Sequence, residues 1–261
     1  MKLYQRLALI CLSGWAMFAI SGCEARSPEP TQAAQKADYD YYLLALSLAP
    51  AFCEDAVGNR RIPRQCRTLE LADFKQSPLT LHGLWPNNRS GRHPFNCGTE
   101  RRNGGMCSLS EVSLPPALTV RLDAAMPGRA DCLDRHEWVK HGSCSGLSVA
   151  DYFEQSVQLT ERANRALGVA LADHAGREVA LDALRATLRQ RDPALLESVS
   201  FDCRTPRSDS PARRKPMLRE VRMYFQVLPD GRVGEPMNFR EVGVKHFNSG
   251  CPGGRAYIDT P

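Results

Sequence analysis

The sequence lacks several patterns that would by themselves indicate a class of protein. No two of its ten cysteines form a CxxC pair, and their irregular spacing disfavours a zinc site. It contains no internal repeat and no clear break in composition, so one main domain is indicated rather than a repeat array. The formal net charge of +5 over 261 residues is small, so total charge alone does not indicate a polyanionic partner. The hydrophobic content of 43% nevertheless allows a sizeable core.

A long apolar run lies at the start of the chain. It extends from Leu7 to Ile20, follows the positive residues Lys2 and Arg6, and is too short for a comfortable membrane span. This pattern is typical of a signal peptide that is removed. The sequence ISGC that ends at Cys23 resembles a bacterial lipobox, in which the cysteine is lipidated and attaches the protein to a membrane. Ordinary secretory cleavage nearby, for instance after Ala25, is the alternative, and both predict an exported protein that is periplasmic or secreted.

The chain therefore divides into three expected parts. Residues 1–22 are the signal peptide, residues 23–38 a flexible tether that carries two prolines and no apolar period, and residues 39–261 a single domain. Removal of Lys2 and Arg6 with the signal lowers the formal net charge from +5 to +3. A weak excess of this kind is compatible with a polyanionic ligand but does not predict one.

Eight cysteines remain after the signal and Cys23 are set aside. An even number in an exported chain predicts up to four disulfides, formed in an oxidising compartment such as a periplasm. Eight cysteines allow 105 complete pairings, so the pairing does not follow from the count. The eight are Cys53, Cys66, Cys97, Cys107, Cys132, Cys144, Cys203 and Cys251.

The pattern of apolar residues predicts strands at both ends of the domain. Runs at 39–50 and 77–86 are typical of buried strands, and the second is expected to bring His82 to a strand end. Strands return at 195–203 and 218–231, the latter ending in Asp-Gly as an exposed antiparallel hairpin.

Helical patterns occupy the middle of the chain. They cover 108–126, 147–167 and 176–191, and a Gly-, Asn- and Arg-rich loop over 87–106 precedes them. The order of strands, helices and strands predicts an α+β fold in which several helices pack on an antiparallel sheet stabilised by disulfides.

The stretch HEWVKHGSC, residues 136–144, concentrates reactive side chains. A zinc-binding HExxH motif needs histidines four apart, whereas His136 and His141 are five apart, which is roughly 140° of helical rotation. Lys140 stands where the second zinc ligand would be. Cys144 is more typical of a disulfide in this compartment than of a nucleophile. Neither a metal nor a cofactor is therefore expected.

Two stretches together resemble the active-site segments of the ribonuclease T2 family, which has bacterial, periplasmic members. They are HGLWP at 82–86 and HEWVKHG at 136–142, in the family's order and at near complete identity. The similarity extends to YYLLALSLAPAFC at 41–53, to MPGRADCLDRHEW at 126–138, and to the late Cys203 and Cys251. It therefore covers most of the chain after residue 39.

The resemblance implies a metal-independent endoribonuclease acting on single-stranded RNA, with a role for each motif residue. His141 is the general base and His82 the general acid, with exchange of the two roles possible in the second step. His136 binds the phosphate, and Glu137 with Lys140 stabilises the transition state. Imidazoles suit both proton transfers, and a cation suits the phosphorane's extra charge.

The products would be 2',3'-cyclic phosphates and then 3'-phosphates. The need for a 2'-OH makes RNA the partner and excludes DNA cleavage by this route. We expect a monomer. A catalytically silent RNA-binding or partner-binding relative is the alternative, and a zinc peptidase would need a third ligand.

Other residues near the motifs have two interpretations each. Trp85 could stack on a base or belong to the core, and Asn87 could hydrogen-bond a base edge, although many family members with base preference carry an acid there. The loop arginines could guide a polyphosphate or form a solvated surface. Trp138 is expected to pack, and His93 and His246 to be structural.

For the disulfides we expect Cys203 with Cys251 and Cys53 with Cys66. Cys144 is expected to pair with Cys97 or Cys107.

Overall fold

The structure is a computed structural model that describes residues 38–56, 62–206, 215–243 and 248–261. The signal, Cys23, nearly all of the expected tether and His246 lie outside these ranges. None of the helices within them is long and apolar enough to cross a membrane.

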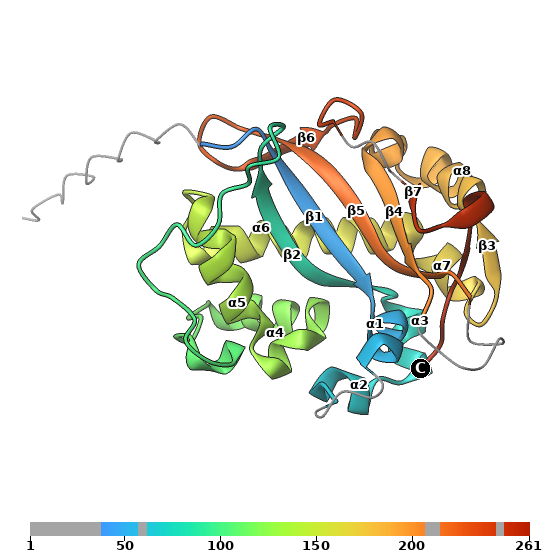
Figure 1. Ribbon diagram of the computed structural model, residues 1–261, viewed down its shortest axis with the longest axis horizontal. Coiled ribbons are helices and arrows are strands. Elements are labelled where there is room, and N and C mark those ends of the chain that lie inside the picture. Colours follow the sequence, from blue (N-terminus) through green and yellow to red (C-terminus); the bar gives the residue numbers. More distant parts are fainter. Residues whose placement is uncertain (1–37, 57–61, 207–214, 244–247) are drawn as a thin grey trace, which may run out of the picture. The chain divides into compact units, whose positions relative to one another are not determined.

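An eight-stranded sheet, mostly antiparallel, forms the centre of the fold (Figure 1). Its main path runs in the order β2-β1-β5-β4-β7, so β1 lies between β2 and β5 and is hydrogen-bonded to both. The strands are β1 (Tyr41–Leu48), β2 (Leu79–Asn87), β3 (Glu178–Ala180), β4 (Val199–Arg204), β5 (Met217–Val227), β6 (Val233–Pro236), β7 (Asn248–Ser249) and β8 (Arg255–Tyr257).

Helices cover one face of this sheet and flank its ends. The long α6 packs against β1 and β2, whereas α5 packs against β2 (Figure 1). The helices are α1 (Ala49–Ala56), α2 (Arg64–Thr68), α3 (Leu71–Gln76), α4 (Pro116–Ala125), α5 (Leu133–Lys140), α6 (Val149–Ala163), α7 (Val169–Asp173) and α8 (Leu181–Arg191). A π-helical turn, Asn164–Gly168, joins α6 to α7.

The two faces of the sheet have different cores. Even-numbered residues of β1, such as Tyr42 and Leu44, enter the main core with residues of α4, α6 and α8. Odd-numbered ones, such as Tyr41 and Leu43, join a smaller cluster on the other face, against which Trp85 packs. This alternation follows from the two-residue period of a strand, and it leaves the second face available for polar groups.

A β-bulge in β2 interrupts the alternation at one residue. Ala45 of β1 pairs with Gly83 and Leu46 pairs with Leu81, so the register skips His82. Leu81 and Leu84 are three apart, and strict alternation would send them to opposite faces, yet both lie in the main core. Bulges re-aim a side chain in this way and are frequent beside active sites.

The α+β prediction is confirmed, and four details differ. His82 lies inside β2, because the strand continues to Asn87. The 218–231 segment does form an antiparallel hairpin with β6, but its strand β5 is mostly buried between β1 and β4 rather than exposed. Of the expected helices, α4 begins only at Pro116, where the double proline allows a helix start, and residues 178–180 pair with β8 before α8 begins.

Four disulfides join the eight cysteines. Cys53 bonds Cys66 and Cys203 bonds Cys251, as expected. Cys144 bonds Cys97, which resolves the alternative, and the remaining pair is Cys107 with Cys132. Cys132 immediately precedes α5 and Cys144 follows it closely, so two of the four disulfides fix the two ends of this one short helix.

Candidate active site

Helix α5 and the residue after it carry four of the motif side chains. His136 and Lys140 are four apart on one face, and Glu137 and His141 are four apart on the neighbouring face. The helix ends at Lys140, and His141 leaves helical geometry with φ −121° and ψ −51°. The amide of His141 still donates to the Glu137 carbonyl at 3.0 Å, so its side chain stays next to the helix.

A hydrogen bond joins α5 to β2 at the site. The indole Nε1 of Trp85 donates to Oε2 of Glu137 at 2.8 Å, and Glu137 is 1% exposed. This bond passes over Gly83, where an added Cβ would collide with both of its partners. The glycine of the HGLWP stretch is therefore required because the helix carboxylate approaches the strand backbone.

The Trp85 ring also lies between two histidines. It stacks on His141 with ring centroids 5.1 Å apart and planes at 29°, and it meets the His82 ring edge to face at 5.1 Å. The Nδ1 atom of His141 is buried and has no hydrogen-bond partner among the described residues. His141 is thus held by ring packing, whereas His82 is held by hydrogen bonding.

Glu220 of β5 is the partner of His82 that the sequence motifs do not indicate. Its Oε1 lies 2.9 Å from Nδ1 of His82, while Nε2 of the same ring lies 3.9 Å from Oε1 of Glu137. Glu220 is 5% exposed, and its second oxygen accepts from Nε of Arg222 at 2.6 Å. The signal that could have found it is an acidic residue close to two arginines, Arg219 and Arg222, in a largely apolar strand.

The carboxylates set the charge of His82. Burial lowers the pKa of this imidazole, but the hydrogen bond with Glu220 and the charges of Glu137 and Glu220 outweigh it, so its pKa is raised. Burial likewise acts to raise the pKa of Glu220, but contacts with His82 and Arg222 lower it below the ordinary value. At Glu137 burial dominates and raises the pKa.

The two histidines on the α5 segment have the opposite tendency. Burial and the nearby Lys140 lower the pKa of His136 to about 4 and that of His141 to about 3. Of the three histidines, His82 is therefore the one whose surroundings favour the cationic form, whereas those of His141 favour the neutral form.

The segment before α5 is fixed against the end of that helix. The amide of Asn96 donates to the Lys140 carbonyl at 2.8 Å, and the amide of Gly98 donates to the Ser143 hydroxyl at 3.2 Å. With the Cys97–Cys144 disulfide, these bonds place the arginine-rich loop beside the histidines. The pKa of His136 is lowered partly by the charge of Arg102 from this loop.

Asn87 does not join the group of motif side chains. It lies five residues beyond His82, about 16 Å along the strand at 3.3 Å per residue. It is 6% exposed, and its side chain hydrogen-bonds the hydroxyl of Tyr41. Trp138 packs against Tyr152 of α6, with ring centroids 5.7 Å apart, and His93 accepts a hydrogen bond from the Asn88 amide.

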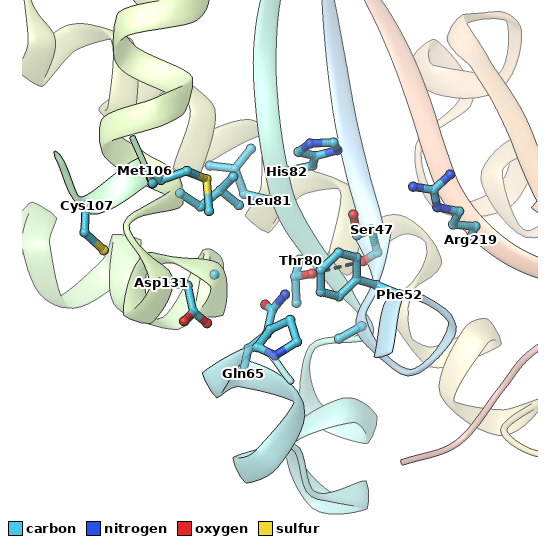
Figure 2. A pocket seen from close by; sticks show the side chains of 15 residues that line it. Ser47, Phe52, Gln65, Thr80, Leu81, His82, Met106, Cys107, Asp131 and Arg219 are labelled. Atoms are coloured by element: carbon cyan, nitrogen blue, oxygen red, sulfur yellow. Dashed lines mark hydrogen bonds between the residues drawn. The ribbon is translucent and has the colours of Figure 1, made fainter. Parts of the chain in front are cut away.

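A cavity of about 430 Å³ opens beside His82 (Figure 2). Its wall includes Ser47 of β1, Thr80 of β2 and Arg219 of β5, and Figure 2 shows His82 and Arg219 coming from strands on either side of the strand that carries Ser47. Phe52 of α1 and Gln65 of α2 also line it. The cavity is large enough for part of a small organic ligand.

No three His, Cys, Asp or Glu side chains in the described part of the chain are arranged to hold a metal ion. The described residues bring together the rings of His82 and His141 around Trp85, with the buried carboxylates Glu137 and Glu220 beside them.

Comparison with known proteins identifies the family. The model of the ribonuclease T2 family matches residues 39–230, and the chain belongs to this family. Ribonuclease I of Escherichia coli strain K12 is 34% identical over 169 residues, which are 57% of this chain and 63% of that protein. A ribonuclease of Aeromonas hydrophila is 34% identical over 125 residues, covering 48% of this chain and 46% of its own. The match thus spans about half to two thirds of these relatives.

Solved structures show the same fold. Ribonuclease MC1 from bitter gourd seeds has a TM-score of 0.55 and 22% identity, and the match covers 84% of this chain and all of that one. A mutant of the same protein in complex with 5'-UMP matches with a TM-score of 0.55 and 23% identity, over 84% of this chain and 98% of that one.

Gly83→Ala tests the close approach of α5 to β2. We expect it to lower the free energy of unfolding by about 1–3 kcal/mol, since the methyl group overpacks the site, and to shift the Trp85 indole N–H resonance as the bond to Glu137 is lost. Gly105→Ala is the control, because an added Cβ there meets no atom within 4 Å. Equal urea midpoints for the two variants would contradict this geometry.

The order of the histidine pKa values can be measured by NMR titration of the imidazole resonances. We expect His82 to titrate above the ordinary value, His136 near pH 4 and His141 near pH 3, for the reasons given above. At about pH 5.5 only His82 of these three should be cationic. Titration of His141 above His82 would reverse the assignment of charge.

Proposed function

We propose that this protein is an endoribonuclease that cleaves single-stranded RNA without a metal ion. The observation that carries the proposal is the placement of His82 and His141 on the Trp85 ring with opposite tendencies toward charge. One is suited to give a proton and the other to accept one, as general acid-base catalysis requires.

In the first step the ribose 2'-oxygen attacks the adjacent phosphorus. His141 takes the 2'-OH proton at Nε2, since its Nδ1 is buried. A bond forms between the 2'-oxygen and phosphorus, and the bond to the 5'-oxygen breaks as His82 donates a proton to that oxygen. The products are a 2',3'-cyclic phosphate and a free 5'-hydroxyl.

In the second step water opens the cyclic phosphate. The two histidines exchange roles, so that His82 accepts a proton from water and His141 returns one to the 2'-oxygen. The result is a 3'-phosphate, and both histidines regain their starting states.

The phosphate is held by the α5 face that carries His136 and Lys140. Lys140 supplies positive charge for the phosphorane, and His136 is a neutral N–H donor because its pKa is low. Glu137 acts with Lys140 in stabilising the transition state. It also orients Trp85, whose indole N–H donates to its carboxylate. The alternative of a silent RNA-binding relative is not favoured, because every motif residue needed for the two proton transfers is present.

The leaving nucleoside would occupy the cavity beside His82, since the general acid must lie next to the 5'-oxygen. The complex of a ribonuclease MC1 mutant with 5'-UMP is consistent with a nucleotide ligand. The amide of Asn96 donates to the carbonyl of Lys140, the residue before His141. The preceding residue, Phe95, is exposed and offers a ring for base stacking. The ring of Trp85 packs against the two histidines, and the side chain of Asn87 hydrogen-bonds Tyr41.

We propose that the protein acts outside the cytoplasm as one domain from residue 39. Four disulfides favour an oxidising compartment, such as the periplasm. Attachment to a membrane through lipidated Cys23, and a monomeric state, belong to the same proposal.

Purified protein incubated with RNA in excess EDTA tests the function. We expect cleavage that proceeds through 2',3'-cyclic phosphate, with His82→Ala and His141→Ala each slower by at least about 100-fold, the typical contribution of acid-base catalysis. His174→Ala is the matched control, because this histidine bonds the Ala170 carbonyl on α7, away from the motifs. Uncleaved RNA with the wild type, or full activity in both catalytic variants, would refute the proposal.

A further inference from the structure

We propose that Glu220 is a positioning residue that fixes the ring of His82 and the proton on its Nδ1, so that Nε2 is the atom that gives its proton to the leaving oxygen. The inference rests on the proposed function in naming His82 as the general acid. Its geometric basis is the 2.9 Å contact between Glu220 Oε1 and His82 Nδ1.

The sheet is built to allow this contact across an intervening strand. His82 is on β2 and Glu220 on β5, and β1 lies between them, so the two backbones are separated by two strand spacings, about 9.5 Å. Between these two residues the side chains that β1 presents on this face are Ala45 and Ser47, which pair with Arg222 and Glu220. Because both side chains are small, the imidazole and the carboxylate can meet above them.

Two bulges direct the side chains that meet there. The β1–β2 register skips His82, and the β4–β5 register passes from Glu220 to Leu218 and skips Arg219. Arg219 lines the cavity beside His82 (Figure 2), and its neighbour Glu220 contacts the imidazole. Adjacent residues of β5 thus serve the cavity and the histidine.

Both oxygens of Glu220 are committed. Oε1 faces His82, and Oε2 accepts from Arg222, which holds the carboxylate ionised. An ionised carboxylate only accepts hydrogen bonds, so Nδ1 of His82 must carry the proton between them. The remaining nitrogen, Nε2, faces Glu137 and the α5 side of the site at 3.9 Å.

The charged groups that act on His82 come from two elements. Glu220 and Arg219 act from β5, Glu137 acts from α5, and the charge of His82 in turn lowers the pKa of His136 and His141. Burial and the charge of Arg219 lower the pKa of His82. Once the Glu220 charge is removed, only the charge of Glu137 acts to raise that pKa. The imidazolium form then becomes less favourable, and the pKa of His82 falls.

Glu220→Gln, which keeps the size of the side chain and removes its charge, tests the inference. We expect the basic limb of the kcat/KM profile to move to lower pH, and kcat near pH 7 to fall by roughly 10- to 100-fold. Activity should recover toward the wild-type value as the pH is lowered, because His82 can be protonated there, and KM should change little. The His82 resonance in NMR should titrate at lower pH in this variant.

Asp202→Asn is the matched control. Asp202 pairs with Glu220 across β4 and β5 on the same face but makes no contact with His82 among the described residues, so the basic limb should stay in place. Glu220→Asp keeps the charge but places it one methylene further from His82. It should therefore move the basic limb and the His82 titration by an intermediate amount. If Glu220→Gln does not fold, this second variant carries the test.

Equal loss of activity at every pH, with an unmoved His82 titration, would show that Glu220 is only structural and would overturn the inference. The titration requires no substrate. A wild type without ribonuclease activity would refute the proposed function, while the His82 shift would still decide the role of Glu220.

Discussion

The hydrogen bond between Trp85 and Glu137 is the interaction on which the rest of the site depends. It directly joins the two motif segments, one on β2 and the other on α5, and its acceptor Glu137 is 1% exposed. A hydrogen bond to a charged group contributes about 1.5–3 kcal/mol. It also fixes the Trp85 ring, and the positions of His82 and His141 are defined relative to that ring. Gly83 permits this bond by leaving room above the strand.

The fold supplies two kinds of restraint around that bond. The sheet positions His82 in two ways, through the bulge in β2 and through the carboxylate of Glu220 on β5. The geometry of His82 therefore depends on the long-range pairing of β2, β1 and β5. Helix α5 is short, and its ends are fixed covalently by the Cys107–Cys132 and Cys97–Cys144 disulfides. A helix this short is not stable alone, so these restraints preserve the placement of His136, Glu137 and Lys140.

The sequence predicted the parts of the site that are local in the chain. The two motifs indicated the family, and the even number of cysteines indicated the disulfides, because both signals are carried by residue type and spacing. Glu220 was missed because its contact crosses from β5 to β2, and pairing order is not visible in one sequence. The same lack of information hid the burial of the 218–231 segment, which forms the expected hairpin with β6 but has its strand β5 between β1 and β4. A bulge also cannot be read from a short apolar run, so His82 was expected at a strand end.

The central claim is that the paired histidines act on the 2'-OH of RNA without a metal ion. A DNA oligonucleotide that contains a single ribonucleotide, incubated with the protein in excess EDTA, tests it most directly, because only one phosphodiester then has a neighbouring 2'-OH. We expect one cleavage, on the 3' side of the ribonucleotide, with a 2',3'-cyclic phosphate as first product. Cleavage at the deoxyribonucleotide linkages, or a first product without the cyclic phosphate, would contradict it.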